Sequence, residues 1–386
     1  MTNKVLLEVK KIVIWYFITL LLAVALLFLV SFIPNTAVIT NVNTSLQEIP
    51  QYITEPMFQF DKRSSMRDGA SEAIMLETCI NNVEMSSFQS IMDAKDYARY
   101  WHGYLVVLRP LLMFFDIEGI YFINQLLFYI LLFVLLYEVI KQKDSIYALL
   151  FILSLIPAYI FLVPLCMEFF GVFLVALISS VVLMKSDKID YKLVFFLAGC
   201  ISSYVDLLSC PLVSLIIPLT FIMLKKENEL NVKQEIQMIF FSCLLWGIGY
   251  VFLWAGKWVI GSLVLHKNVI VDAIMQTKLR AGDSSLSRPM SVIGAIEPYF
   301  NFHNRLIFLS VGIECCAVII SIVRKNNNIV WKVIVQIIPL LWYFLAANHS
   351  VIHNFMTYRN VIVIMYLLFI ITYEAIGSFM IKKVEL

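Results

Sequence analysis

The most constraining feature of the sequence is a series of long apolar runs that contain almost no charge. Segments such as 12–33 and 118–140 reach the roughly 20 apolar residues that a helix needs to cross a hydrocarbon layer of about 30 Å. Apolar residues make up 61% of the 386 residues, and charged residues only 15%. A soluble core of this size cannot hide so many apolar side chains, so the sequence predicts a membrane protein.

About ten segments have the length and hydropathy of membrane-spanning helices. They are 12–33, 118–140, 146–164, 165–184, 193–208, 209–224, 237–256, 305–323, 330–347 and 359–381. The short connections inside 146–184 and 193–224 indicate tight helical hairpins. We therefore expect an all-α polytopic membrane protein with about ten transmembrane helices, folded as a single transmembrane domain over residues 1–386.

The basic residues are distributed unevenly between the two sides of these segments. If the N-terminus is inside, more than half of the 29 Lys and Arg residues lie in cytoplasmic connections and tails, and the short outer connections contain none. Because basic residues are retained in the cytoplasm, we expect a multi-pass protein of the plasma membrane with both termini cytoplasmic. The first apolar run is too long for a secretory signal, so it is interpreted as a retained anchor.

Two outer connections are long, residues 34–117, where surface helices are expected, and residues 257–304. Long connections in a compact protein are usually functional or disordered, and the aromatic and apolar residues of these two argue against disorder. The net charge of +2 gives no indication of a nucleic-acid partner, and the seven cysteines show no C-x-x-C spacing. Function is therefore expected at the outer face.

Ionisable and polar residues of the apolar segments gather close to this outer face. They are Glu168, Asp206, His349, His353, Tyr358 and Arg359. Charged groups are costly within hydrocarbon, and an ion pathway would scatter acids through the depth of the membrane. Only Glu314 falls near mid-membrane, so the pattern favours a site that faces outward.

The first outer segment holds the densest set of chemically useful side chains. Asp68 and Glu72 are four residues apart, so they share one face if this stretch is helical. Arg99, His102 and Arg109 follow the spacing of one stripe on a second helix. A carboxylate can deprotonate a hydroxyl, and a guanidinium group or an imidazole facing it can hold a phosphate. Arg suits this role because it donates two parallel hydrogen bonds to a phosphate.

The residues of the first outer segment also have structural interpretations. Arg99 and Arg109 near a membrane surface can pair with lipid phosphates or with Asp93 and Asp96. The aromatic cluster in 97–104 is typical of an interfacial belt as well as of a platform that stacks on sugars.

The same holds for the groups near the span ends. His349 and His353 resemble half of a metal site without further ligands, and hydrogen bonding at the interface is the alternative. Asp206 can cap a turn, and Glu168 can interact with the dipole at a helix N-terminus.

Three segments carry a family resemblance. They are A-R-Y-W-H-G-Y-L-V-V-L-R-P-L-L (98–112), Y-V-D-L-L-S-C-P-L-V (204–213) and A-N-H-S-V-I-H-N-F-M-T-Y-R-N (347–360). With a first span followed by a long outer loop that contains an acid, the chain resembles the GT-C class of integral-membrane glycosyltransferases, of the bacterial surface-polysaccharide type. Members of that class use sugars carried on a polyprenyl phosphate.

The resemblance implies an inverting single displacement that moves a sugar from the polyprenyl-phosphate carrier to an acceptor hydroxyl of a glycan or other molecule. Asp68 matches the outer-loop carboxylate that acts as base, with Glu72 as its competitor. In that class, basic residues hold the phosphate leaving group. The matching residues here are Arg99, Arg109 and Arg359, with His102, His349 and His353 in support. The first loop lacks the adjacent acids common in the class, so the choice of base and any divalent metal stay open.

Two other functions fit the same features. A transporter or flippase of a lipid-linked glycan also places basic residues near the membrane surface, although we find neither the internal repeats nor the paired helix interruptions typical of such proteins. A non-catalytic membrane scaffold of cell-envelope assembly would use the long outer segments as docking surfaces.

Overall fold

The computed structural model describes the chain except for residues 1, 50–54, 59–60, 62, 283–286 and 385–386. The described chain is a bundle of α-helices. Its one short antiparallel pair joins β1 (Glu55–Pro56) to β2 (Met66–Arg67) in the first outer segment. The expected all-α architecture is confirmed.

Six apolar stretches in the described chain are long enough to cross a membrane, by length and composition. They are Val5–Ser31 in α1 (Thr2–Ser31), α6 (Ile117–Gln142), α8 (Met167–Lys185), α11 (Val232–Leu265), α14 (Asn304–Val323) and Asn354–Gly377, which leads into α18 (Val361–Val384). Three shorter helices are also apolar, α7 (Ser145–Leu155), α9 (Tyr191–Val205) and α15 (Ile329–Leu345). The chain is therefore a polytopic membrane protein.

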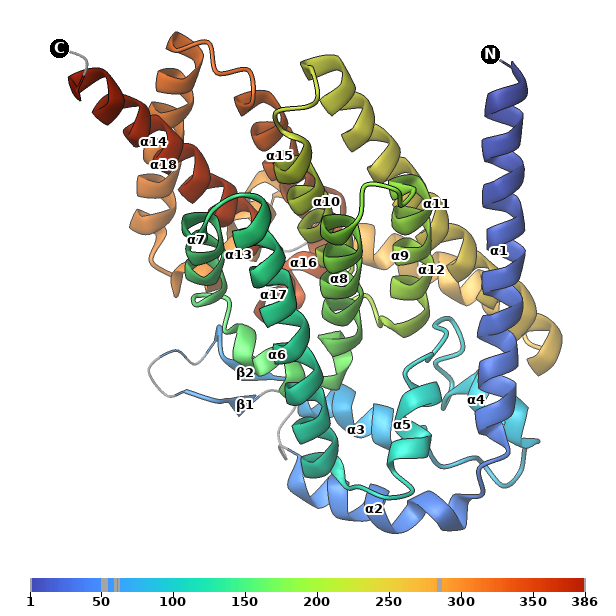
Figure 1. Cartoon of the computed structure of the whole chain (residues 1–386). Coiled ribbons are helices and arrows are strands. Elements are labelled where there is room, and N and C mark those ends of the chain that lie inside the picture. Colours follow the sequence, from blue (N-terminus) through green and yellow to red (C-terminus); the bar gives the residue numbers. More distant parts are fainter. Residues whose placement is uncertain (1, 50–54, 59–60, 62, 283–286, 385–386) are drawn as a thin grey trace.

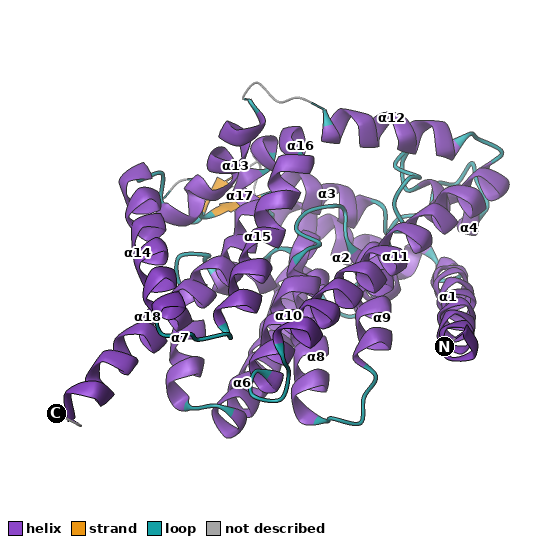
Figure 2. Cartoon of the chain, turned by 90° about the horizontal axis from the view of Figure 1, so that it is seen from above, coloured by secondary structure: helices purple, strands orange, loops and turns teal. Residues whose placement is uncertain are grey.

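Both termini lie at one end of the bundle, which we call the terminal end (Figure 1). The opposite end, which we call the loop end, carries the four helices of the first outer segment. They are α2 (Asn35–Glu48), α3 (Gly69–Glu77), α4 (Ser87–Asp93) and α5 (Leu105–Leu111). Seen along the bundle, α1 stands at its edge while α8 and α10 (Val213–Lys226) lie inside it (Figure 2). Most residues of α8 and α10 are buried accordingly.

The packing of α9 on α11 depends on two glycines. A Cβ atom at Gly199 would lie 2.1 Å from the carbonyl oxygen of Trp246, and one at Gly249 would lie 2.2 Å from that of Phe196. Such distances are impossible for real atoms, so only glycine allows these two backbones to approach so closely. Small residues serve the same purpose between helices in many membrane proteins.

The segment 146–164, which we expected to be one helix, is divided. Helix α7 ends at Leu155, two residues before Pro157, and the 3-10 helix η1 (Ile160–Leu165) follows after a turn. Proline has no backbone N–H and its ring clashes with the preceding helical turn, which explains the break.

The second outer segment is shorter than expected because α11 continues to Leu265. It contains α12 (Val269–Ala281), α13 (Arg288–Ile296) and the 3-10 helix η2 (Glu297–Phe300). Three further short elements precede α18, namely α16 (Ala347–Ile352), α17 (Asn354–Thr357) and η3 (Tyr358–Asn360).

A buried network of charges joins helices at the terminal end. Lys332 of α15 is fully buried, and its Nζ lies 2.6 Å from Glu227 and 2.7 Å from Glu374 of α18. Lys143, after α6, also pairs with Glu227 at 2.8 Å. Each buried charge has an opposite partner, so the network fixes which helices meet at this end.

Candidate functional site

The turn after α9 forms the base of the candidate site. Asp206 is buried, and its carboxylate accepts hydrogen bonds from the backbone N–H of Ser209 (3.0 Å) and the Ser209 hydroxyl (2.7 Å). The hydroxyl of Tyr250 on α11 donates to its other oxygen at 3.2 Å. Asp206 therefore closes the turn between α9 and α10, as the capping interpretation expected, and also joins this turn to α11.

Glu168 lies beside this turn, in the first turn of α8. Its side chain is buried, and its Oε2 has no hydrogen-bond partner in the described chain. It interacts electrostatically with Asp68, Asp206, Glu72 and Arg359. Glu168 and the four residues with which it interacts come from four separate parts of the sequence, and we call these five residues the loop-end cluster.

Arg359 is the cation of the loop-end cluster and is fully buried. One amino group, Nη1, donates to the carbonyl of Phe355 at 2.9 Å, and the rings of Phe169 and Tyr358 lie 4.6 and 4.9 Å from the guanidinium carbon. Its Nε and Nη2 have no partner in the described chain. A buried guanidinium with two unused donors can bind an anionic group such as a phosphate.

Tyr358 holds Arg359 in place rather than facing the cluster. Its hydroxyl lies within hydrogen-bond distance of the carbonyls of Ser64 (2.8 Å) and Ala158 (3.0 Å). The hydroxyl can donate to either carbonyl, so this residue ties the start of the last apolar stretch to the first outer segment.

The two candidate bases, Asp68 and Glu72, have different surroundings. Asp68 is the N-cap of α3 and not part of the helix, and its carboxylate accepts from the backbone N–H and the hydroxyl of Ser71, both at 3.0 Å. The residue as a whole is half-buried.

Glu72 is only 1% exposed. It accepts hydrogen bonds from the Tyr121 hydroxyl (2.8 Å) and the backbone N–H of Met167 (3.1 Å), and it pairs with Arg67 (3.4 Å). Burial raises the pKa of this carboxyl. Glu72 is therefore buried and fully engaged, whereas Asp68 is partly exposed and its described side-chain hydrogen bonds come from Ser71 alone.

The two histidines near the last apolar stretch lie close together, with ring centres 4.8 Å apart. His349 is buried, and its Nε2–H donates to the carbonyl of Leu208 at 2.6 Å, while Nδ1 has no partner in the described chain. Burial lowers its pKa to about 3 and also lowers the pKa of His353, so both rings are neutral. The Nδ1 of His349 is then a hydrogen-bond acceptor without a donor.

Arg280, near the end of α12, is an additional cation of the site. It interacts electrostatically with His349 and His353, and its guanidinium carbon lies 5.8 Å from the centre of the Tyr100 ring. His353 also interacts with Asp68, which connects Arg280 to the loop-end cluster. Within the described part of the chain, no hydrogen bond or ion pair occupies its guanidinium.

A row of aromatic rings runs beside these residues. The ring of Tyr100 stacks between those of Tyr97 (5.4 Å) and Trp254 (5.6 Å), and Trp254 contacts Tyr250 edge to face at 6.0 Å. The Tyr100 hydroxyl is buried without a partner in the described chain, and it interacts electrostatically with Asp206. Burial raises the pKa of this hydroxyl.

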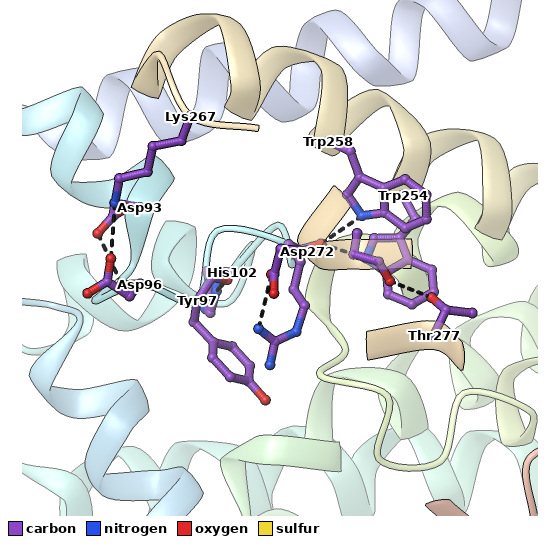
Figure 3. A network of polar contacts seen from close by, with 11 residues as sticks. Asp93, Asp96, Tyr97, His102, Trp254, Trp258, Lys267, Asp272 and Thr277 are labelled. Atoms are coloured by element: carbon purple, nitrogen blue, oxygen red, sulfur yellow. Dashed lines mark hydrogen bonds and ion pairs between the residues drawn. The ribbon is translucent and has the colours of Figure 1, made fainter. Parts of the chain in front are cut away.

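Arg99 supports this row of rings through Tyr97 and pairs with Asp272, and both of these partners are labelled in Figure 3. Its guanidinium carbon lies 3.8 Å from the centre of the Tyr97 ring, and its Nη1 pairs with Asp272 of α12 at 3.4 Å. The backbone carbonyl of Arg99 accepts hydrogen bonds from the indole N–H groups of Trp254 and Trp258. Neither Asp93 nor Asp96 is its partner, because Lys267 pairs with both, at 2.8 and 3.0 Å.

The expected helical stripe of Arg99, His102 and Arg109 does not form. Residues 97–104 make irregular turns, His102 has a φ of 56°, and α5 begins only at Leu105. The His102 ring is buried with Nε2 3.0 Å from the Tyr97 carbonyl and Nδ1 2.9 Å from the Tyr104 hydroxyl. Both ring nitrogens are used, so His102 braces this loop.

Arg109 also lies apart from the loop-end cluster. Fully buried, it donates to the side-chain oxygen of Asn81 at 2.6 Å and to the carbonyl of Ile33. It thereby joins α5 to the end of α1 and to the loop after α3. Its contacts are structural, but its partners in the described chain are not Asp93 or Asp96, which the structural interpretation had named.

The structure thus brings together Asp68, Glu72, Glu168, Asp206 and Arg359, with His349 and His353 next to them, and separates Arg99, His102 and Arg109 from them. The sequence analysis missed Arg280, Tyr100 and Tyr250. Tyr100 was visible only as part of an aromatic cluster, and no pattern around Arg280 set it apart from the other basic residues of its segment.

No group of three or more His, Cys, Asp or Glu residues in the described part of the chain has the geometry to hold a metal ion. No protein-family model matches the chain, and comparisons with curated proteins and with solved structures find no match either. The function is therefore argued from the geometry of the loop-end cluster.

Proposed function

We propose that the chain is a membrane glycosyltransferase of the GT-C type. It moves a sugar from a polyprenyl-phosphate carrier to an acceptor hydroxyl at the loop end, which faces the outside of the plasma membrane. The observation that carries this proposal is the pairing of two features around buried Glu168, which interacts electrostatically with partly buried Asp68 of the first outer segment and with Arg359, whose Nε and Nη2 are unused.

Asp68 is the proposed base. Its carboxylate is half-buried and its described hydrogen bonds come from Ser71 alone, so lone pairs remain for an acceptor hydroxyl. Glu72 is occupied by Tyr121, Met167 and Arg67, which favours a positioning role. Geometry is the first requirement for a general base, and Asp68 meets it better.

Arg359 and Arg280 are the proposed ligands of the departing phosphate. Arg359 offers Nε and Nη2, and Arg280 offers a guanidinium that contacts only the Tyr100 ring in the described chain. Fixed donors at the place where negative charge develops stabilise a transition state strongly in a site with little water. The unpaired Nδ1 of His349 can accept a hydrogen bond from a sugar hydroxyl.

The reaction is one displacement at the anomeric carbon. Asp68 takes the proton of the acceptor hydroxyl, whose oxygen attacks the anomeric carbon from the face opposite the phosphate. The bond between that carbon and the phosphate oxygen breaks, and its electron pair leaves with the polyprenyl phosphate. The product has the inverted anomeric configuration, and the phosphate charge is balanced by Arg359 and Arg280.

We further propose ten membrane passes with cytoplasmic termini. The six long apolar stretches would be joined by the shorter helices α7, α9, α10 and α15. An even number of passes agrees with the position of both termini at one end (Figure 1).

The test is sugar transfer by the purified full chain, supplied with a panel of polyprenyl-phosphate hexoses and glycan acceptors. We expect Asp68→Asn to slow transfer by a factor of about 10² to 10⁴ while leaving thermal unfolding unchanged. Glu77→Gln is the matched control, because Glu77 ends the same helix and pairs only with exposed Lys95.

Transfer that is equal in Asp68→Asn and in the unmodified protein would disprove the assignment of the base. If no donor of the panel is consumed, but liposomes containing the protein move a lipid-linked glycan between leaflets, the chain is a flippase and the proposed function is wrong. Consumption of no donor and no translocation would instead favour a scaffold.

A further inference from the structure

An apolar groove lies between the first half of α1 and helices α9 and α11, toward the terminal end. It has a volume of about 760 Å³. One wall is formed by α1 from Val5 to Phe17, the other by α11 from Phe241 to Phe252, and Phe196 of α9 contributes to the lining. Helix α1 stands at the edge of the bundle in Figure 2.

Two contacts within the lining stretch of α1 fix this helix to the bundle. Lys11 pairs with Asp190, the residue before α9. Further along α1, the Tyr16 hydroxyl donates to the carbonyl of Phe252 at 3.3 Å, and the two rings meet edge to face. These contacts set the spacing between α1 and its neighbours along the groove.

The apolar walls of the groove require an apolar occupant. Val9 and Phe17 on α1 are 54% and 61% exposed, and Phe252 on α11 is 55% exposed. Apolar surface in contact with water costs about 25 cal/mol per Å², and an empty groove forfeits the dispersion contacts of its walls. Within a bilayer, an acyl chain is the apolar group at hand to fill it.

Two charged residues lie among the apolar ones. Glu8 on α1 and Lys192 at the start of α9 line the groove, and Lys192 Nζ lies 5.0 Å from the centre of the Phe241 ring. Neither has an ion-pair partner among the described residues. One free anion and one free cation at an apolar groove complement a headgroup that itself carries one charge of each sign.

We propose that this groove binds a phospholipid with a primary ammonium headgroup. Its acyl chain lies between α1 and α11, its phosphate is held by Lys192 and its ammonium by Glu8. A single negative headgroup would leave Glu8 unpaired, and a quaternary ammonium would offer Glu8 no hydrogen bond, so the pair selects an ethanolamine-type lipid.

The test measures lipid binding to the delipidated full chain by native mass spectrometry in detergent. Lipids with the same acyl chains and an ethanolamine, a glycerol or a choline headgroup are titrated separately. We expect the ethanolamine lipid to bind about tenfold more tightly than the other two, which corresponds to one charge-assisted hydrogen bond. Lys192→Gln and Glu8→Gln should each remove this preference.

Leu244→Trp, which places a bulky ring in the groove, should abolish binding of the acyl chain. Two matched controls should bind lipid like the unmodified protein. They are Lys188→Gln, in the connection before α9 and outside the groove, and Leu263→Trp, on α11 beyond the groove. Equal affinity for all three headgroups, or an unchanged preference in both Gln variants, would overturn the proposal. Cross-linking of two chains through α1 would show that a second copy fills the groove instead. None of these measurements depends on sugar transfer.

Discussion

The carboxylate of Glu72 accepts a hydrogen bond from the backbone N–H of Met167 at 3.1 Å. Met167 begins α8, whose first amide groups have no partner within the helix, so a residue of the first outer segment satisfies one of them. The same carboxylate also receives the Tyr121 hydroxyl from α6. One side chain thereby fixes the outer segment, and with it the start of α3 where Asp68 lies, to the two helices α6 and α8.

Replacing Glu72 by Ala should destabilise the protein. It leaves the Met167 N–H and the Tyr121 hydroxyl without their acceptor and removes the ion-pair partner of Arg67, whose remaining described hydrogen bond goes to the Tyr121 hydroxyl at 2.8 Å. Loss of one partner from a buried ion pair costs about 3 kcal/mol or more. Thermal unfolding in detergent measures the change. Tyr121→Phe removes the donor to Glu72 and the acceptor of Arg67 but keeps the ion pair, so it should cost less, about 2 kcal/mol. Equal stability of Glu72→Ala and the unmodified protein would contradict the positioning role.

Arg109→Ala should lower the yield of folded protein, because the buried guanidinium joins Asn81 to Ile33. A hydrogen bond to a charged group contributes about 1.5–3 kcal/mol. A double-mutant cycle with Asn81→Ala should give a coupling energy in that range, measured by thermal unfolding. A variant that folds normally but no longer transfers sugar would instead assign Arg109 to the substrate.

Stability should fall in acid, in part through His102. Burial lowers its pKa to about 3, below its usual value of 6.5. Between these two values the unfolded chain binds a proton that the folded chain does not, so the free energy of unfolding decreases as the pH falls below about 6.5. His102→Asn removes this contribution, and Asn tolerates the positive φ of this position. The difference in unfolding temperature between the two proteins should therefore change between pH 7 and pH 4. A difference independent of pH would exclude His102 as a source.

Arg280→Ala should reduce sugar transfer by about 100-fold without changing thermal unfolding, since its guanidinium contacts only the Tyr100 ring in the described chain. Arg280→Lys should retain part of the activity because it keeps the charge and loses the second donor. Lys278→Ala, an exposed residue two positions earlier, is the control. Loss of stability and activity together would indicate that Arg280 supports the fold.

The apolar segments could be predicted from the sequence because hydropathy and length constrain a membrane helix directly. The division of 146–164 could have been found from Pro157, which lies inside the expected span. The helical stripe at 99–109 was wrong because spacing alone does not reveal the positive φ of His102, which a network of side chains maintains.

The position of the candidate site under one face could also be predicted, since Glu168, Asp206 and Arg359 all lie at the ends of apolar runs. The role of each residue in the candidate site could not be predicted from the sequence. Whether an arginine faces the cluster depends on partners distant in the sequence, such as Asp272 for Arg99, and these are set by tertiary packing.

The Tyr358 hydroxyl reaches the carbonyl of Ser64 across 294 residues of sequence. The chain is synthesised from the N-terminus, so the first outer segment is made long before the last apolar stretch, which carries Tyr358. The anchor of Ser64, and the cation Arg359 next to it in sequence, are added only when the last apolar stretch has been made. A chain truncated before this stretch would carry most of the acids of the loop-end cluster but neither its cation nor this anchor, so the cluster is completed by one of the last segments to be synthesised.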